Sequence, residues 1–135
     1  MKLVRKKSGF TILNILIVLS VFGIFIVSAV PTYLQFIENA KKTVSIGALE
    51  TVRAFMKNYV IDHGVYPARF NFSNCTDGYN RFILPPATCE QLKHELYSFS
   101  SYNSAGKSYE LQAKAIDSAQ TILRLTPGEI VAVAP

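Results

Sequence analysis

The feature that most constrains this chain is a long stretch without charge near its N-terminus. No lysine, arginine, aspartate or glutamate occurs from Ser8 to Ile37, a stretch of 30 positions. Within it, Phe10 to Val30 would form a helix about 31 Å long, which matches the hydrocarbon core of a bilayer. The stretch therefore predicts a membrane-spanning helix. The residues that follow it, 98 in number, are enough for one small globular core.

Charge is concentrated at the extreme N-terminus. The chain has 14 basic and 9 acidic residues, and four of the basic ones lie in the first seven positions (Lys2, Arg5, Lys6 and Lys7). The remainder is nearly neutral, so the high isoelectric point is poor evidence for a nucleic-acid-binding surface. Basic flanks stay on the cytoplasmic side of a membrane. We therefore expect a cytoplasmic N-terminus and a C-terminal part outside the cytoplasm.

Three classes of protein share such a beginning. The first is a plain single-pass membrane protein. The second is a secreted soluble domain whose signal peptide is cut after Ala29, since Val27-Ser28-Ala29 has the small residues of a cleavage site. The third is a chain cut before the apolar segment, which then stays in the mature protein.

The residues at the junction favour the third class. Lys6-Lys-Ser-Gly-Phe-Thr-Ile-Leu13 resembles the leader junction of type IV prepilins and type II secretion pseudopilins. The resemblance implies that a prepilin peptidase cuts between Gly9 and Phe10 and that the new N-terminus at Phe10 is N-methylated. Gly23 and Pro31 stand where this family has a glycine inside the membrane helix and a proline near its end. The resemblance therefore implies that both residues take part in filament assembly.

Asn14 departs from the family pattern. The fifth mature residue is usually glutamate, whose carboxylate would neutralise the buried α-amino group of a neighbouring subunit. An asparagine offers a hydrogen bond but no charge. In this family, loss of the acid is typical of subunits at the filament tip. Asn14 therefore favours a minor or initiating pilin. The simpler interpretation is that Asn14 forms a local hydrogen bond and is merely tolerated at this position.

An amphipathic pattern follows the apolar segment and predicts one long helix from Phe10 to about Asp62. His63-Gly64 should end the helix, since glycine commonly follows a helix C-terminus. Glu38 and Lys42 have the spacing of an i,i+4 ion pair. The segment closing at Tyr66-Pro67 resembles the end of the long helix in pilins and pseudopilins. The residues at helical spacing on the apolar face are Leu49, Val52, Met56 and Tyr59, widened by Ala48, Phe55 and Val60.

The rest of the chain predicts a small α+β domain. Residues 65–87 and 98–107 have the composition of loops. Thr88 to Glu90-Gln91 fits a capping box before a short helix that runs to about Tyr97. Three apolar segments then predict strands at 109–115, 121–126 and 129–133, the last two joined by a Pro127-Gly128 turn. We expect a three-stranded antiparallel meander packed on the long helix, as in a pilin.

Two cysteines, Cys75 and Cys89, lie 14 residues apart. If this part of the chain is outside the cytoplasm, a disulfide is expected, whereas two free thiols are the alternative. His63 and His94 have no metal-ligand spacing with the cysteines or with each other. No catalytic set, metal site or cofactor site is predicted, and the protein is not expected to be an enzyme.

Aromatic residues are frequent in and near the loops, where Arg69, Arg81 and Lys93 are interleaved with them. Such a surface admits DNA as a partner through base stacking. The alternative, which the near-neutral charge favours, is that the rings seal a small core and pack against filament neighbours. The residues concerned are Phe70, Phe72, Tyr79, Phe82, Tyr97, Phe99 and Tyr102.

Together these expectations describe a leader at 1–9, a membrane and filament-core helix at 10–30 and a periplasmic pilin-like domain at 31–135. The resemblance implies an inner-membrane precursor that later joins a periplasmic or surface filament. Its partners would be other pilin subunits, a prepilin peptidase and methyltransferase, an ATPase and an assembly platform. The favoured function is a minor or tip pilin. The alternatives are a type II secretion pseudopilin and the secreted soluble domain.

Overall fold

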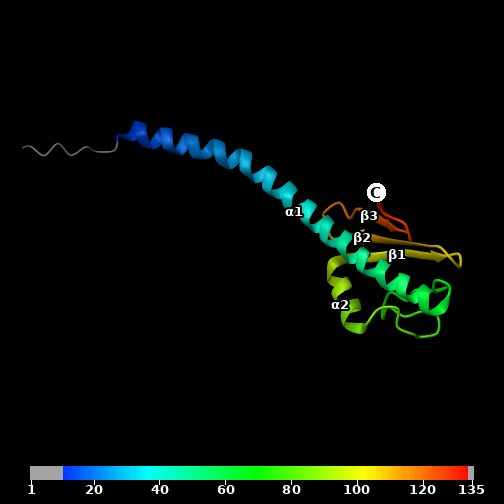
Figure 1. Cartoon of the computed structure of the whole chain (residues 1–135). Coiled ribbons are helices and arrows are strands. Elements are labelled where there is room, and N and C mark those ends of the chain that lie inside the picture. The colour runs from blue at the N-terminus through cyan, green and yellow to red at the C-terminus, as the bar shows by residue number, and fades with distance from the viewer. Residues whose placement is uncertain (1–10, 134–135) are drawn as a thin grey trace, which may run out of the picture. The chain divides into compact units, whose positions relative to one another are not determined.

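The computed structural model describes residues 11–133 and contains two helices and one four-stranded sheet (Figure 1). The chain divides into two compact units, one ending at Phe36 and the other beginning at Ile37. Helix α1 (Ile12–His63) contributes its first part to one unit and its second part to the other. The predicted start of the helix, Phe10, lies outside the described residues. The predicted end at Asp62 is one residue from the observed end.

Gly64 terminates α1 as the sequence predicts. Its φ of +79° is the left-handed conformation that glycine adopts without a Cβ penalty. The Gly64 amide donates to the Val60 carbonyl oxygen at 2.8 Å, which satisfies one of the acceptors left free at a helix end. The chain then turns away into the loop that begins at Val65.

The sheet has four strands, so the predicted three-stranded meander is wrong by one strand. The strands are antiparallel and lie in chain order: β1 (Leu96–Ser104), β2 (Tyr109–Ala115), β3 (Ile122–Leu125) and β4 (Ile130–Val133). The last three correspond to the three predicted strands. The α+β class is confirmed, with a long N-terminal helix and a small antiparallel sheet.

Strand β1 occupies most of the segment that was predicted to be a loop at 98–107. Its sequence is rich in serine, and its pairing with β2 shifts register twice, between Leu96 and Ser98 and between Phe99 and Ser101. Each shift interrupts the two-residue alternation by which a strand is recognised. Because β1 is an edge strand with mostly exposed side chains, apolar periodicity could not reveal it.

Helix α2 (Pro86–Glu95) begins two residues before the predicted capping box. Pro85 occupies the N-cap position and Pro86 the first turn, and no side chain caps the helix. Proline suits the first turn because the amide that it lacks would have no intrahelical partner. Leu96 is already extended, so the predicted extension of the helix to Tyr97 is also wrong.

The second unit encloses one apolar core between α1, α2, the sheet and the loop at 65–85. In Figure 1 the second part of α1 runs alongside the strands, and its buried side chains belong to the same cluster as theirs. Phe55 and Val60, predicted to widen the stripe, are only half-buried. The buried members of the predicted helical stripe are Ala48, Leu49, Val52, Met56 and Tyr59, and those of β2 and β3 are Tyr109, Leu111, Ala113, Ala115, Leu123 and Leu125.

Candidate functional site

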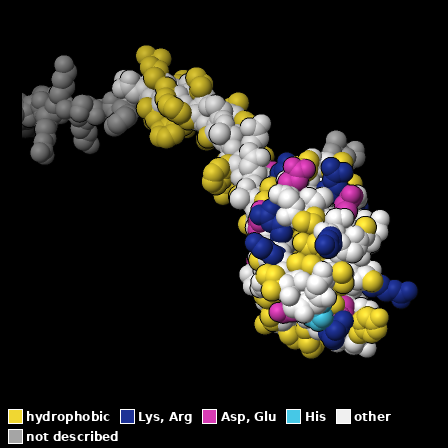
Figure 2. Space-filling view, turned by 45° about the vertical axis from the view of Figure 1, so that its right-hand side comes forward, with side chains coloured by type: hydrophobic (Ala, Val, Ile, Leu, Met, Phe, Trp, Pro, Cys, Tyr) yellow, Lys and Arg dark blue, Asp and Glu magenta, His cyan; other side chains and the backbone are white. Residues whose placement is uncertain are grey.

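The first unit presents a helical surface that is free of charge and mostly apolar. Every described residue up to Phe36 is exposed, and no charged residue occurs among them. The most apolar 18-residue stretch of α1 has a mean hydropathy of 2.7 and is not buried within the chain. By length and composition, this is a helix that could cross a membrane. The space-filling view shows apolar and white atoms along this part of the helix, while charged side chains gather on the second unit (Figure 2).

Three hydroxyl groups of this segment are satisfied by its own backbone. Ser20 Oγ donates to the Leu16 carbonyl oxygen at 2.7 Å, and Ser28 Oγ donates to that of Ile24 at 2.9 Å. Thr32 Oγ1 donates to the Ser28 carbonyl oxygen at 3.3 Å. A polar group without a partner is costly in an apolar environment. The back-bonded hydroxyls therefore suit a segment that is surrounded by lipid or by other apolar helices.

The predicted assembly residues that the structure describes, Asn14, Gly23 and Pro31, are spread along α1. Gly9 and Phe10, the predicted cleavage and methylation sites, lie outside the described residues. Asn14 is exposed in the first turn of α1, where its backbone amide donates to the Thr11 carbonyl oxygen at 2.9 Å. Gly23 is exposed, and a Cβ added there would meet no atom within 4 Å. Pro31 lies inside α1, which continues through it without a break.

Ser45 is a buried polar residue that the sequence did not reveal as structural. Its Oγ donates to the Glu95 carbonyl oxygen at 2.8 Å and accepts from the Ile116 amide at 3.1 Å. One hydroxyl therefore joins α1 to the end of α2 and to the segment just after β2. The partners lie 50 and 71 residues away along the chain, so no local pattern could signal them.

Glu38 forms a second attachment between α1 and the loop after β2. Its Oε2 accepts from the Ser118 amide at 2.6 Å, and Lys41 Nζ lies 3.1 Å from its Oε1. The predicted pairing with Lys42 is therefore wrong, since the ion pair has i,i+3 spacing. The Ser118 amide and the Lys41 ammonium lower the pKa of Glu38.

Cys75 and Cys89 form a disulfide, as the sequence predicts for a domain outside the cytoplasm. Both are buried, so the bond ties the loop at 65–85 to the first turns of α2 from inside the core. Cys75 has a φ of +55°, an uncommon conformation for a residue with a side chain. Its carbonyl oxygen accepts from the amides of Ile83 and Leu84, which folds the loop back on itself.

A buried carboxylate organises the same loop. Asp77 accepts hydrogen bonds from the Tyr59 hydroxyl at 2.8 Å and from Arg81 Nε at 2.8 Å. It also accepts from the backbone amides of Tyr79 and Arg81, at 2.8 and 2.9 Å. A carboxylate that is paired and fully hydrogen-bonded can be buried without a large cost. Asp77 therefore fastens the loop to the end of α1 through Tyr59.

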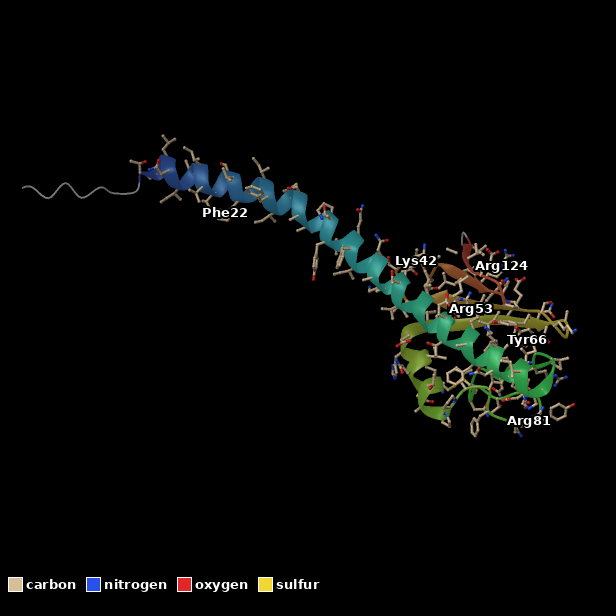
Figure 3. The ribbon with its side chains drawn as sticks, viewed as in Figure 1. Phe22, Lys42, Arg53, Tyr66, Arg81 and Arg124 are labelled. Carbon is tan, nitrogen blue, oxygen red and sulfur yellow. A yellow bond between two sulfur atoms is a disulfide. The ribbon has the colours of Figure 1, made fainter. Side chains whose placement is uncertain are left out.

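The titration of Asp77 follows from these contacts. Burial by itself would raise the pKa, but the donors on Arg81, Tyr59 and Tyr79 outweigh it and lower the pKa to about 2. The pKa of Tyr59 is raised by its burial and by the adjacent Asp77 carboxylate. Arg81, which is labelled in Figure 3, keeps half of its side chain exposed. The network is thus charged at neutral pH and structural in character.

The aromatic residues of the loops divide into two sets. Phe70, Phe72, Phe99 and Tyr102 pack on one another and on the core, with Phe72 stacked on Phe99 at 4.8 Å between ring centroids. Exposed rings make up the second set: Tyr79, Phe82 and Tyr97. One of these, Tyr79, has the Arg81 guanidinium 5.2 Å from its ring centroid. The core-sealing interpretation is thus correct for the first set only.

The two histidines have different surroundings. His63 Nδ1 lies 3.0 Å from the Tyr59 carbonyl oxygen, and its ring stacks on that of Tyr59, in agreement with the predicted helix-end role. His94 is exposed on α2. Among residues 11–133, no group of three or more histidine, cysteine, aspartate or glutamate side chains is placed to hold a metal ion.

Comparison with known proteins identifies one informative relative. The chain is 33% identical over 64 residues to the type II secretion system core protein G of Pseudomonas aeruginosa, and the match covers 47% of this chain and 45% of that protein. The chain thus matches about half the length of this relative. No family model and no solved structure matches the chain. The similarity to a type II secretion core protein and the apolar N-terminal helix together confirm the resemblance of this chain to the family of type IV pilins and type II secretion pseudopilins.

Proposed function

We propose that this protein is a structural subunit of a pilin-like filament and that the helix at 12–36 is its assembly surface. The observation that carries the proposal is a charge-free helix, exposed along its whole length, in a chain whose second unit has a complete core of its own. A soluble monomer rarely exposes so large an apolar surface. A lipid bilayer would cover this surface before assembly, and the helices of neighbouring subunits would cover it in the filament.

Assembly of this kind needs no catalytic group. Moving a helix from lipid to a helix bundle gains little from exclusion of water, so close packing of side chains must drive association. The hydroxyls of Ser20, Ser28 and Thr32 are bonded to the helix backbone, so these three donors stay paired during the transfer. We therefore assign the chain a structural role.

Asn14 supports a position at the filament tip or in a minor subunit. A bulk subunit with glutamate here could neutralise the α-amino group of the subunit ahead of it, whereas Asn14 brings no charge. A tip subunit has no neighbour ahead, so it loses nothing by lacking the acid. The proposed boundaries remain a leader at 1–9, a membrane helix at 10–30 and a periplasmic domain at 31–135.

A pseudopilin of a type II secretion system is the second candidate function. The similarity to core protein G of such a system favours it directly. The proposed partners are common to both candidates: the inner membrane, other subunits, a prepilin peptidase that acts at Gly9 and Phe10, an ATPase and an assembly platform. DNA stays a candidate partner for the pilus alone, through exposed rings such as Tyr79.

The decisive experiment is N-terminal mapping and intact-mass analysis of the protein from membranes and from sheared surface material. We expect a mature start at an N-methylated Phe10. Recovery from sheared material would support a pilus, whereas retention in the periplasm would support a secretion pseudopilin. A start at Val30 would identify a secreted soluble domain, and an intact Met1 would identify an ordinary membrane anchor. Either of the last two results would overturn the proposal.

The role of Asn14 needs a separate test. Asn14→Glu restores the carboxylate and should raise incorporation along the filament shaft, measured by immunogold labelling. Asn14→Gln is the matched control, because a glutamine side chain has nearly the shape of glutamate but no charge. Equal incorporation of the two variants would contradict the tip assignment and leave the filament proposal intact.

A further inference from the structure

Two aromatic residues lie at the C-terminal end of the apolar segment. Tyr33 and Phe36 are 64% and 69% exposed, so the chain itself does not cover their rings. The first charged residue after the segment is Glu38, and Lys41 and Lys42 follow it. The sequence of surfaces along the helix is thus apolar, then aromatic, then charged.

The two rings face the same side of the helix and lean toward its apolar part. Side chains on an α-helix tilt toward its N-terminus and cover the preceding turn. In agreement, Tyr33 and Phe36 line one shallow hollow together with Phe25 and Ala29, which lie one to three turns earlier. The aromatic rings therefore extend the apolar surface rather than the charged one.

The length of the helix sets the distance of these rings from the middle of the segment. Phe22, labelled in Figure 3, lies at the middle of the uncharged stretch from Ser8 to Ile37. Tyr33 is 11 residues further on, which corresponds to about 16 Å along the helix axis. Half the hydrocarbon thickness of a bilayer is about 15 Å. A bilayer centred on Phe22 would thus have its boundary at Tyr33.

We infer that Tyr33 and Phe36 anchor the helix in the lipid ester and headgroup region, on the side of the membrane opposite the N-terminal lysines. Tyrosine suits this region because its ring is apolar and its hydroxyl can meet water or a lipid ester. Phe36, one turn further, fills the outer part of the same layer. This inference rests on the proposed membrane-anchored function, and it moves the anchored end of the helix beyond Val30 to residues 33–36.

Single-tryptophan fluorescence can test the depth of each position, because the chain contains no tryptophan. The full chain would be reconstituted in phosphatidylethanolamine–phosphatidylglycerol vesicles that contain lipids brominated either near the ester groups or deep in the acyl chain. Tyr33→Trp reports on the anchor, and Phe22→Trp reports on the centre. Tyr97→Trp is the matched control in the second unit, since Tyr97 is a similarly exposed tyrosine.

The three reporters separate the inference from the function on which it rests. We expect Tyr33→Trp to be quenched roughly twofold more by shallow bromines than by deep ones, and Phe22→Trp to show the reverse. Tyr97→Trp should be quenched by neither. If Tyr33→Trp is quenched mainly by deep bromines or by neither kind while Phe22→Trp is quenched as expected, the anchor is refuted. If Phe22→Trp also escapes quenching, the membrane helix itself is refuted.

A second set of variants tests whether the rings hold the helix in place. In a Phe22→Trp background, Tyr33→Ala with Phe36→Ala should shift the preference of Phe22→Trp for deep bromines toward shallow ones, because the helix can slide along the membrane normal. Leu34→Ala is the control, as it removes an exposed apolar side chain between the two rings. An unchanged quenching profile in the double variant would show that the rings do not anchor the helix.

Discussion

The two units of this protein differ in whether their apolar side chains are buried or exposed. The second unit buries its apolar side chains against one another and fastens its loops with Ser45, Asp77 and a disulfide. In the first unit, none of the apolar side chains from Ile12 to Phe36 is buried, and three hydroxyls are bonded to the backbone of their own helix. The same kind of residue therefore stabilises the fold in one unit and is available to a membrane or a partner in the other.

The largest expected effect concerns burial in the second unit. Leu49→Ala removes a fully buried side chain and leaves a cavity, so the free energy of unfolding should fall by about 2–5 kcal/mol. Leu16→Ala makes the same change on the exposed apolar helix and should leave the unfolding transition of the second unit unchanged. Chemical denaturation of the detergent-solubilised chain measures both. Equal losses would mean that the two units are not energetically distinct.

The next effect concerns insertion of the first unit. Leu19→Arg places a charge in the middle of the apolar segment and should disfavour insertion by about 3 kcal/mol. Ile61→Arg makes a comparable change at a similarly exposed apolar residue of the second unit. There the free energy of unfolding should change by no more than about 0.5 kcal/mol. Membrane fractionation followed by carbonate extraction compares the two variants. The proposed membrane role would be contradicted by full insertion of Leu19→Arg.

Removal of the disulfide should weaken the second unit alone. A bond across 14 residues of chain stabilises a fold by about 3 kcal/mol, through the entropy that it removes from the unfolded chain. Cys75→Ser with Cys89→Ser should lower the free energy of unfolding by this amount, measured by denaturation, and leave membrane insertion unchanged. A reducing agent should destabilise the natural protein and have no effect on the double variant. Equal free energies of unfolding for the natural protein and the double variant would rule out a stabilising bond.

The smallest effect is the dependence of stability on acid. Asp77 has a pKa of about 2 in the folded chain, below the value of about 3.9 for an unfolded chain. Its contribution, roughly 2–3 kcal/mol, is complete above the unfolded pKa and is lost as the pH falls through the folded pKa. Asp77→Asn should therefore flatten the fall in stability between about pH 5 and pH 2.

The control for this experiment is Asp62→Asn, which changes an exposed carboxyl group near the end of α1. It should preserve the acid dependence of the natural protein. If Asp77→Asn and Asp62→Asn give the same stability profile against pH, the buried network is not the source of that dependence.

The sequence predicted the long helix, its end at Gly64 and three of the four strands, because each of these has a strong local pattern. Strand β1 was missed because its serines and two register shifts conceal the alternation, and α2 began early because Pro85-Pro86 replaced the expected cap. Neither Ser45 nor Asp77 could be predicted as a structural centre. The partners of Ser45 lie 50 and 71 residues away. Asp77 reaches α1 only through Tyr59, 18 residues earlier in the chain, so the tertiary fold is needed to make these contacts.

Ser45 has a consequence for the folding of the second unit. Its hydroxyl is fully used only when the end of α2 and the end of β2 reach it together, and successive residues of a helix point about 100° apart. A helix rotated by one residue would turn this hydroxyl away and leave the Glu95 carbonyl and the Ile116 amide unpaired. The hydrogen bonds of Ser45 thus favour one rotation of α1 about its own axis. The wide apolar stripe of α1 alone would tolerate several.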